Sequence, residues 1–281
     1  MAGFGDGPFG SSAFGDGDGG GSGGGGPLVA TPEPAHSPPR VRLDFTDTSA
    51  TVTSLTITRQ DASGRTYTVR TSDGGPLQVS GGVATLWDYE APYGQTITYT
   101  TDSGGTASTQ LDVPRSWLIH PGVPSRSCPL VFGQGSFGAV TRSIVQGSFT
   151  VLGRSTPVIT TGGARVAGAS QFVLMTETIA DADALDLLFS DGSPLFLNVP
   201  PSLSYDVAPM YIAVGDVAFG RPSSVAMHKD RSITVPYQTV ARPGGGTRAA
   251  VTWDVVASQY ATWADLAATG LTWAELVAPT S

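Results

Sequence analysis

The chain has 281 residues and a net charge of −8, with 15 Lys and Arg against 23 Asp and Glu. This acidity argues against a nucleic-acid partner, because duplex binding needs several cationic side chains on one face. The single cysteine, Cys128, rules out an intrachain disulfide, and no apolar run approaches the ~18 residues that span a bilayer.

The composition favours a β-rich protein, since Thr, Ser, Val and Gly dominate and Lys is almost absent. The first ten residues lack the basic and apolar regions of a signal peptide. We therefore expect a soluble protein that folds in a reducing cytoplasm and does not insert into a membrane.

The first 26 residues contain 13 glycines, with Phe4, Phe9 and Phe14 at intervals of five. A segment this rich in glycine forms no core of its own and is flexible in isolation. It is either a flexible tail with incidental phenylalanines or an arm whose phenylalanines dock on another surface, and we favour the arm. The proline-rich stretch 27–40 is predicted to be an extended, semi-rigid spacer, so residues 1–39 form an arm and a linker.

Residues 40–114 alternate apolar and polar side chains in short runs separated by glycine-rich turns. In the run VRLDF, for example, Val41, Leu43 and Phe45 share one face. About seven such strands in this space indicate a small β-sandwich of immunoglobulin or fibronectin type III kind. The segment DYEAPYG (88–94) is predicted to turn the chain before a late strand, with Tyr89 or Tyr93 packing beneath it.

A proline-punctuated connection (113–129) leads into a second β-domain, which we assign to residues 115–248. One helix interrupts its strands: Thr178 is a suitable N-cap, Asp181 suits the positive end of the helix dipole, and Gly192 ends it. We therefore expect an antiparallel sheet with a single packed helix.

The final segment, residues 249–281, repeats every ten residues, with Trp253, Trp263 and Trp273 each preceded by Thr. The spacing of Thr and acidic residues in the last two units indicates the start of short helices. Helices under about 12 residues are marginal in water without tertiary contacts. The three indoles therefore need a surface to bury against, on this chain or on a neighbour.

Residues 131–140, VFGQGSFGAV, match the glycine-rich loop of protein kinases, with Gly133, Gly135 and Gly138 as the G-x-G-x-x-G. A kinase also needs a lysine on the following strand, but the only lysine of the chain is Lys229, far downstream. No helix pattern opens at Gly138, as a dinucleotide-binding unit requires, and no Gly-Lys-Ser/Thr is present. We predict a turn between strands.

The sequence offers little support for other catalytic or metal sites. His120 and Cys128 form a conceivable nucleophile pair, but the flanking Ser127 and Pro129 favour an ordinary half-buried thiol. Metal sites need clustered His, Cys or carboxylates, which the sequence does not show. We expect no catalytic constellation, no cofactor and no metal site, and hence no enzyme.

The order of these features is that of a known family. A Phe/Gly-rich start precedes a β-sandwich with DYEAPYG and the connector SWLIHPG; a β-domain follows with ADADALDLLFSDGSPLFL, YIAVGDVAF and SITVPYQTVARP, and TWADL units end the chain. The chain resembles minor tail proteins of long-tailed phages (siphoviruses) of actinobacteria, and its second half resembles the β-sandwich of distal tail proteins. The fold class that we expect is therefore mainly β: two β-sandwich-type domains between a glycine-rich arm and a Thr-Trp repeat with short helices.

The resemblance implies a non-catalytic structural virion protein of the tail tip, made in the host cytoplasm. Such a protein associates with itself into a symmetric ring between the tail tube and the tip or baseplate subunits. Aromatic anchors dominate interface energetics, so we expect the assembly contacts at Phe4, Phe9, Phe14, Trp253, Trp263 and Trp273.

Two alternatives remain. One β-sandwich is a host-binding module for cell-wall carbohydrate, with Trp87 or Tyr93 stacking on sugars, although core packing is the commoner role at those positions. A cell-wall hydrolase is disfavoured because the sequence offers no acid/base pair of carboxylates.

Overall fold

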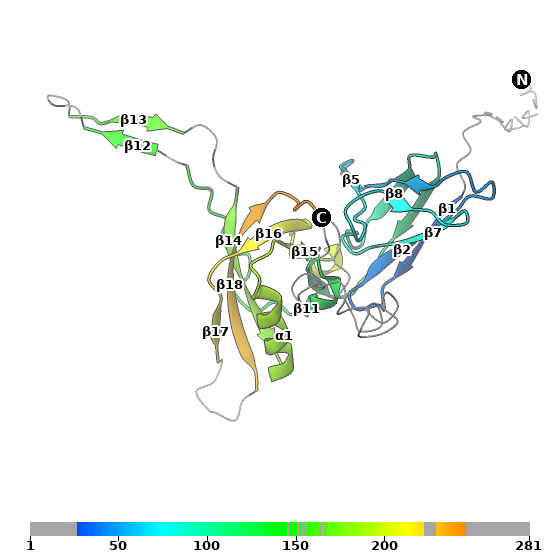
Figure 1. The fold of residues 1–281 in the computed structure, drawn as a ribbon. Helices are drawn as coiled ribbons and strands as arrows, with labels where there is room; N and C mark the ends of the chain where they lie inside the picture. The colour runs from blue at the N-terminus through cyan, green and yellow to red at the C-terminus, as the bar shows by residue number, and fades with distance from the viewer. Residues whose placement is uncertain are drawn as a thin grey trace, which may run out of the picture.

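The computed structural model describes residues 27–144, 146–150, 152, 155–162, 165, 167–221 and 229–245. In this part of the chain antiparallel strands predominate and there is one α-helix, which confirms the predicted mainly-β class. The strands form two adjoining β-domains, and a two-stranded hairpin extends away from the second domain (Figure 1).

Two facing sheets build the first domain. One has the order β1-β2-β7, the other β5-β4-β8-β9, and a short pair, β3 and β6, lies beside them. Buried side chains of both sheets, such as Phe45 and Tyr99, meet in one hydrophobic core, as a β-sandwich requires. The bounds are β1 (Leu28–Glu33), β2 (Arg40–Thr46), β3 (Ser54–Leu55), β4 (Ile57–Gln60), β5 (Thr66–Thr68), β6 (Leu77–Gln78), β7 (Val83–Asp88), β8 (Thr96–Thr101) and β9 (Thr106–Gln110).

The predicted spacer at residues 27–40 is wrong over β1. This strand pairs with β2 along its whole length, from Leu28 opposite Phe45 to Glu33 opposite Arg40, and Leu28 is buried. Proline normally argues against a strand because it cannot donate to the ladder. Here β1 is the edge strand of its sheet, where a missing donor is tolerated.

The second domain is one antiparallel sheet with the order β11-β10-β15-β16-β18-β14, and β17 also pairs with β18. The helix α1 starts at the predicted cap, where the backbone N–H of Asp181 donates to Thr178 Oγ1 (3.1 Å). The bounds are β10 (Ser116–Ile119), β11 (Cys128–Leu130), β14 (Ala169–Thr176), α1 (Ile179–Phe189), β15 (Leu195–Asn198), β16 (Met210–Val214), β17 (Ala218–Gly220) and β18 (Arg231–Val240), with 3-10 turns η1 (Pro124–Arg126) and η2 (Pro201–Leu203).

Strand β10 corrects the prediction of a plain connection over 113–129. All four of its side chains are buried. Leu118 belongs to the core of the second domain, whereas Trp117 and Ile119 belong to the core of the first. The strand therefore serves a core on each face and shows no alternation of apolar and polar residues. Phe196 of β15 and Tyr211 of β16 lie on the same shared face.

The sheet of the second domain closes on itself. After β11 the chain runs along the free edge of β14: Met175 donates its N–H to Val131 (2.9 Å) and Gly133 donates to Val173 (2.7 Å). A bridge between Phe132 and Leu174 lies between these two bonds. The segment that continues β11, at one end of the sheet, is thereby paired with β14 at the other end, as in a β-barrel.

The projecting hairpin consists of β12 (Gln146–Phe149) and β13 (Val158–Thr161), which pair only with each other among the described strands. Its base is a bridge between Thr141 and Ala169, the first residue of β14. Figure 1 shows the hairpin reaching away from both domains.

Candidate functional site

The residues that the sequence predicts for assembly lie outside the described part of the chain. This applies to Phe4, Phe9, Phe14, Trp253, Trp263 and Trp273 and to the predicted helices of the Thr-Trp repeat. Their roles remain predictions.

The glycine motif at 131–140 lies between strands, as predicted, and forms part of the closed sheet. The N–H groups of Gly133 and Phe137, which a nucleotide loop would direct at phosphate, donate instead to carbonyls of β14. Phe137 has a φ of 59°, and its ring lies against Phe132 and Phe172, with ring centroids 4.9 and 5.8 Å away. The backbone N–H groups of the motif therefore close the sheet, and its Phe137 ring packs in an aromatic cluster.

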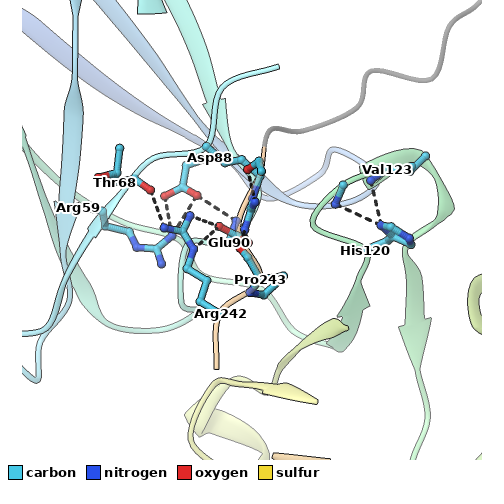
Figure 2. Close-up of polar contacts among 11 residues, drawn as sticks. Arg59, Thr68, Asp88, Glu90, His120, Val123, Arg242 and Pro243 are labelled. Carbon is cyan, nitrogen blue, oxygen red and sulfur yellow. Dashed lines mark hydrogen bonds and ion pairs between the residues drawn. The ribbon is translucent and has the colours of Figure 1, made fainter. Parts of the chain in front are cut away.

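His120 and Cys128 do not form an activated pair. His120 accepts the N–H of Val123 at Nδ1 (2.9 Å; Figure 2). Its Nε2 bonds to Asp191 Oδ2 (2.9 Å), so that neither ring nitrogen is left for the thiol. Burial, together with the negative charge of Asp181, raises the pKa of the Cys128 thiol to about 11. A protonated thiol is a poor nucleophile, and the histidine instead fixes the turn after β10.

The two domains meet at a buried charged cluster, which we call the polar joint: Arg59, Arg70, Asp88, Glu90 and Arg242. Arg59 holds both carboxylate oxygens of Asp88, at 3.0 and 2.8 Å (Figure 2). The side chains of these two residues are only 4% and 2% exposed. The Tyr99 hydroxyl also donates to Asp88 (3.0 Å), which satisfies a further lone pair of this carboxylate.

Glu90 connects the domains directly. It accepts a bond from Arg70 of the first domain (3.1 Å) and bonds from Nε (3.1 Å) and Nη2 of Arg242, which follows β18 in the second domain. Arg242 also donates to the carbonyl of Thr68 (2.7 Å), and Arg70 to that of Pro243 (2.8 Å). Arg242 therefore binds both a side chain and the backbone across the boundary, and Arg70 binds the backbone across it.

Burial on its own would lower the pKa of Arg59, but the charge of Asp88, with smaller contributions from Tyr99 and Glu90, outweighs it and raises that pKa. Burial, and next the charge of Asp88, raises the pKa of Tyr99 well above its ordinary value. The guanidinium stays charged and the phenol stays neutral. Arg59 is therefore a fixed cation of the polar joint.

Asn198 makes the second link between the domains. This fully buried residue at the end of β15 donates to the carbonyl of Ala91 (2.8 Å) and accepts the N–H of Tyr93 (3.2 Å). Gly94 has a φ of 67°, and a Cβ there would lie 2.9 Å from Cδ of Pro201. The predicted corner DYEAPYG is thus the segment that docks on the second domain, with Tyr93 buried as expected.

Sequence reasoning missed the partners of this corner. Arg59, Asn198 and Arg242 lie far from it in the chain, and no spacing rule links them. The available signal was local: Asp88 and Glu90 stand among apolar and aromatic residues, and buried carboxylates require cationic partners.

The two aromatic residues proposed for sugar stacking, Trp87 and Tyr93, differ in their exposure. Tyr93 is fully buried, and burial raises the pKa of its phenol, so it offers no face to an external ligand. Trp87 is 39% exposed on the outer side of β7. The sugar-binding alternative is therefore wrong for Tyr93, and Trp87 remains a candidate.

The β12–β13 hairpin carries exposed apolar side chains on both strands. Phe149 is 58% and Ile159 56% exposed, and Val158, which pairs with Phe149, is exposed as well. A two-stranded hairpin by itself is marginally stable in water. Phe149 and Val158 share one face of the hairpin, and Ile159 lies on the other face.

Within the described residues, no group of three or more His, Cys, Asp or Glu is arranged to hold a metal ion. No helix in the same residues is long and apolar enough to cross a membrane. A scan against protein-family models finds no family that matches this chain, and a search of curated proteins finds no significant match.

Proposed function

We propose that this chain is a non-catalytic structural protein of a phage tail tip, which assembles into a symmetric ring between the tail tube and the distal tip. The proposal joins the family resemblance of the sequence to one structural observation, the projecting β12–β13 hairpin.

The hairpin supports assembly because exposing its apolar side chains to water costs free energy in a lone subunit. Its apolar residues Phe149, Val158 and Ile159 are between 39% and 58% exposed in the described part of the chain. Burying them on a neighbour removes apolar surface from water, at roughly 25 cal/mol for each Å². A hairpin that docks on a different surface of the next copy makes a head-to-tail contact, and such contacts close into a ring when the rotation allows it.

The polar joint supports the same function. A ring closes only if every subunit has the same shape, because small angular errors add up around it. Arg242 and Asn198 bond the second domain to the first through buried contacts, which favours one fixed angle between the domains. An enzyme cleft between domains would instead call for motion.

The direct test is the solution mass of the full chain. Light scattering after size exclusion should give a multiple of the 28.8 kDa subunit for the native protein. The double variant Phe149→Ser/Ile159→Ser should give a smaller species with an unchanged melting temperature. As a matched control, Leu187→Ser replaces an exposed apolar residue on α1 and should leave the mass unchanged.

A native chain that is monomeric at all concentrations, or a double variant that assembles like the control, would refute this function.

The alternative function, recognition of a cell-wall carbohydrate, is favoured by a different observation: the exposed indole of Trp87 borders a cavity.

A further inference from the structure

A cavity of about 460 Å³ lies where the first domain meets the 3-10 turn η1 of the second. Its volume is within the range of small-molecule sites, and boundaries between domains are a common place for them. Trp87 and Tyr89 provide aromatic walls, Asp73 and Gln78 provide polar groups, and Ser125 of η1 borders the other side. We call it the Trp87 pocket.

The aromatic wall is held in position by Arg40. The guanidinium carbon lies 5.0 Å from the ring centroid of Trp87 and 5.7 Å from that of Tyr89. Arg40 is itself fixed by Glu33 (2.6 Å) and by the Tyr89 hydroxyl (2.9 Å). The indole is therefore a pre-oriented surface, and a ligand that stacks on it loses little side-chain entropy from the protein.

The carboxylate of Asp73 disfavours an anionic ligand in this pocket. Arg40 and Arg70 also line it; Glu33 pairs with the first, while Glu90 pairs with the second and with Arg242. The pKa of Asp73 is lowered by the N–H of Gly75 and then by the Thr71 hydroxyl. An ionised carboxylate repels anions and attracts hydroxyl donors.

The polar groups keep free capacity for hydrogen bonds. Thr71 and Gly75 both donate to Oδ1 of Asp73, and among the described residues no hydrogen bond reaches its Oδ2. Gln78 is exposed, and its amide nitrogen donates to Pro76 (3.3 Å) while its amide oxygen has no donor in this part of the chain. Both acceptors stand beside an aromatic platform.

We propose that the Trp87 pocket binds a neutral saccharide unit, with the C–H face of the sugar ring stacked on Trp87 and its hydroxyls donating to Asp73 and Gln78. A sugar ring combines one apolar face with a rim of hydroxyl groups, and the pocket presents one aromatic face with a rim of acceptors. This proposal rests on the alternative function given above. It does not require ring assembly, so its failure would leave the assembly function untouched.

The test is saturation-transfer NMR on the full chain with glucose, galactose, mannose, arabinose and N-acetylglucosamine as neutral probes and glucuronate as the anionic one. At least one neutral sugar should bind saturably, and Trp87→Ala should weaken it by about tenfold or more, as expected for a lost stacking contact. Trp87→Phe keeps an aromatic face and should bind in between. Phe219→Ala removes an exposed aromatic side chain on β17 and serves as the matched control, with native affinity expected.

Gln78→Ala keeps the proposal testable if Trp87→Ala fails to fold, because Gln78 is exposed and lies outside the core; it should weaken binding severalfold. Three results would overturn the proposal: no saturable transfer from any neutral sugar, equal binding by Trp87→Ala and Phe219→Ala, or stronger binding of glucuronate than of every neutral probe.

Discussion

Glu90 is the residue at which charges of the two domains meet. It is buried and accepts bonds from Arg70 and Arg242, so the substitution Glu90→Gln leaves these two guanidinium groups, 7% and 21% exposed, short of a counter-charge. Breaking a buried ion pair from one side typically costs 3–5 kcal/mol, and we expect a loss of about 3 kcal/mol in the free energy of unfolding by urea.

The control for Glu90 is Asp44→Asn, which removes the partner of Arg42 in a more exposed ion pair, with side chains 35% and 44% exposed. Exposed ion pairs contribute about 0–1 kcal/mol, so this variant should lose little. Equal losses in the two variants would mean that the polar joint does not hold the domains together.

Asp47 gives the protein a predictable acid sensitivity. Its carboxylate accepts the Ser49 hydroxyl and the N–H groups of Ser49, Thr51 and Val52. These bonds, first the Ser49 hydroxyl and next the Val52 N–H, lower its pKa below the ordinary range. A lowered pKa stabilises the folded state at neutral pH, and that stabilisation is lost as the pH falls below about 4 toward the folded-state pKa.

The measurement is the melting temperature from pH 7 to pH 3 for the native chain and for Asp47→Asn, which cannot ionise. The native chain should be the more stable at pH 7, and the difference should shrink in acid. A difference that stays constant over this range would contradict the assigned role of Asp47.

Among the elements, the loop 131–140 carries the glycine motif of a nucleotide-binding loop but uses it for a structural purpose. Its Gly133 and Phe137 N–H groups are bonded to β14, so we expect millimolar MgATP to leave the melting temperature unchanged. A nucleotide at about 100 times its Kd would add roughly 2.7 kcal/mol of stability. A rise of the melting temperature with MgATP would restore the nucleotide-loop interpretation.

The elements also differ in how far the sequence foretells them. Helix α1 follows from local signals, because Thr178 and Asp181 lie three residues apart and cap it directly. The alternation of Val41, Leu43 and Phe45 reveals β2, because one face of that strand is buried and the other is not. Strand β10 escapes the same test because Trp117 and Leu118 face two different cores.

The contacts of the polar joint could not be predicted from local sequence patterns either. Arg242 meets Glu90, and Asn198 meets Tyr93, only after both domains have folded and docked. No periodicity records such a pairing. The residue types of DYEAPYG indicated a turn, whereas its partners required the tertiary structure.

At the scale of the whole molecule, one sheet face of the second domain completes the core of the first. Trp117, Phe196 and Tyr211 lie in the same cluster as Phe45 and Tyr99. The domains thus share apolar as well as ionic contacts, and we expect a single unfolding transition for residues 27–245. The hairpin stands apart from this body (Figure 1).

The amino-terminal segment yields a prediction at this scale. If Phe4, Phe9 and Phe14 are assembly contacts, deletion of residues 1–26 should leave the melting temperature of the two domains unchanged. The same deletion should impair incorporation into tail particles, measured by co-purification with them. A truncated chain that is incorporated normally would refute the docking role of these phenylalanines.

A cryo-electron microscopy map of the intact tail particle tests the structural role of this protein best. We expect several copies in a closed ring at the distal end of the tube, with each β12–β13 hairpin seated on the adjacent copy and Phe149 and Ile159 buried. A map in which the chain is absent from the tail, or in which its hairpin extends into solvent, would contradict that role.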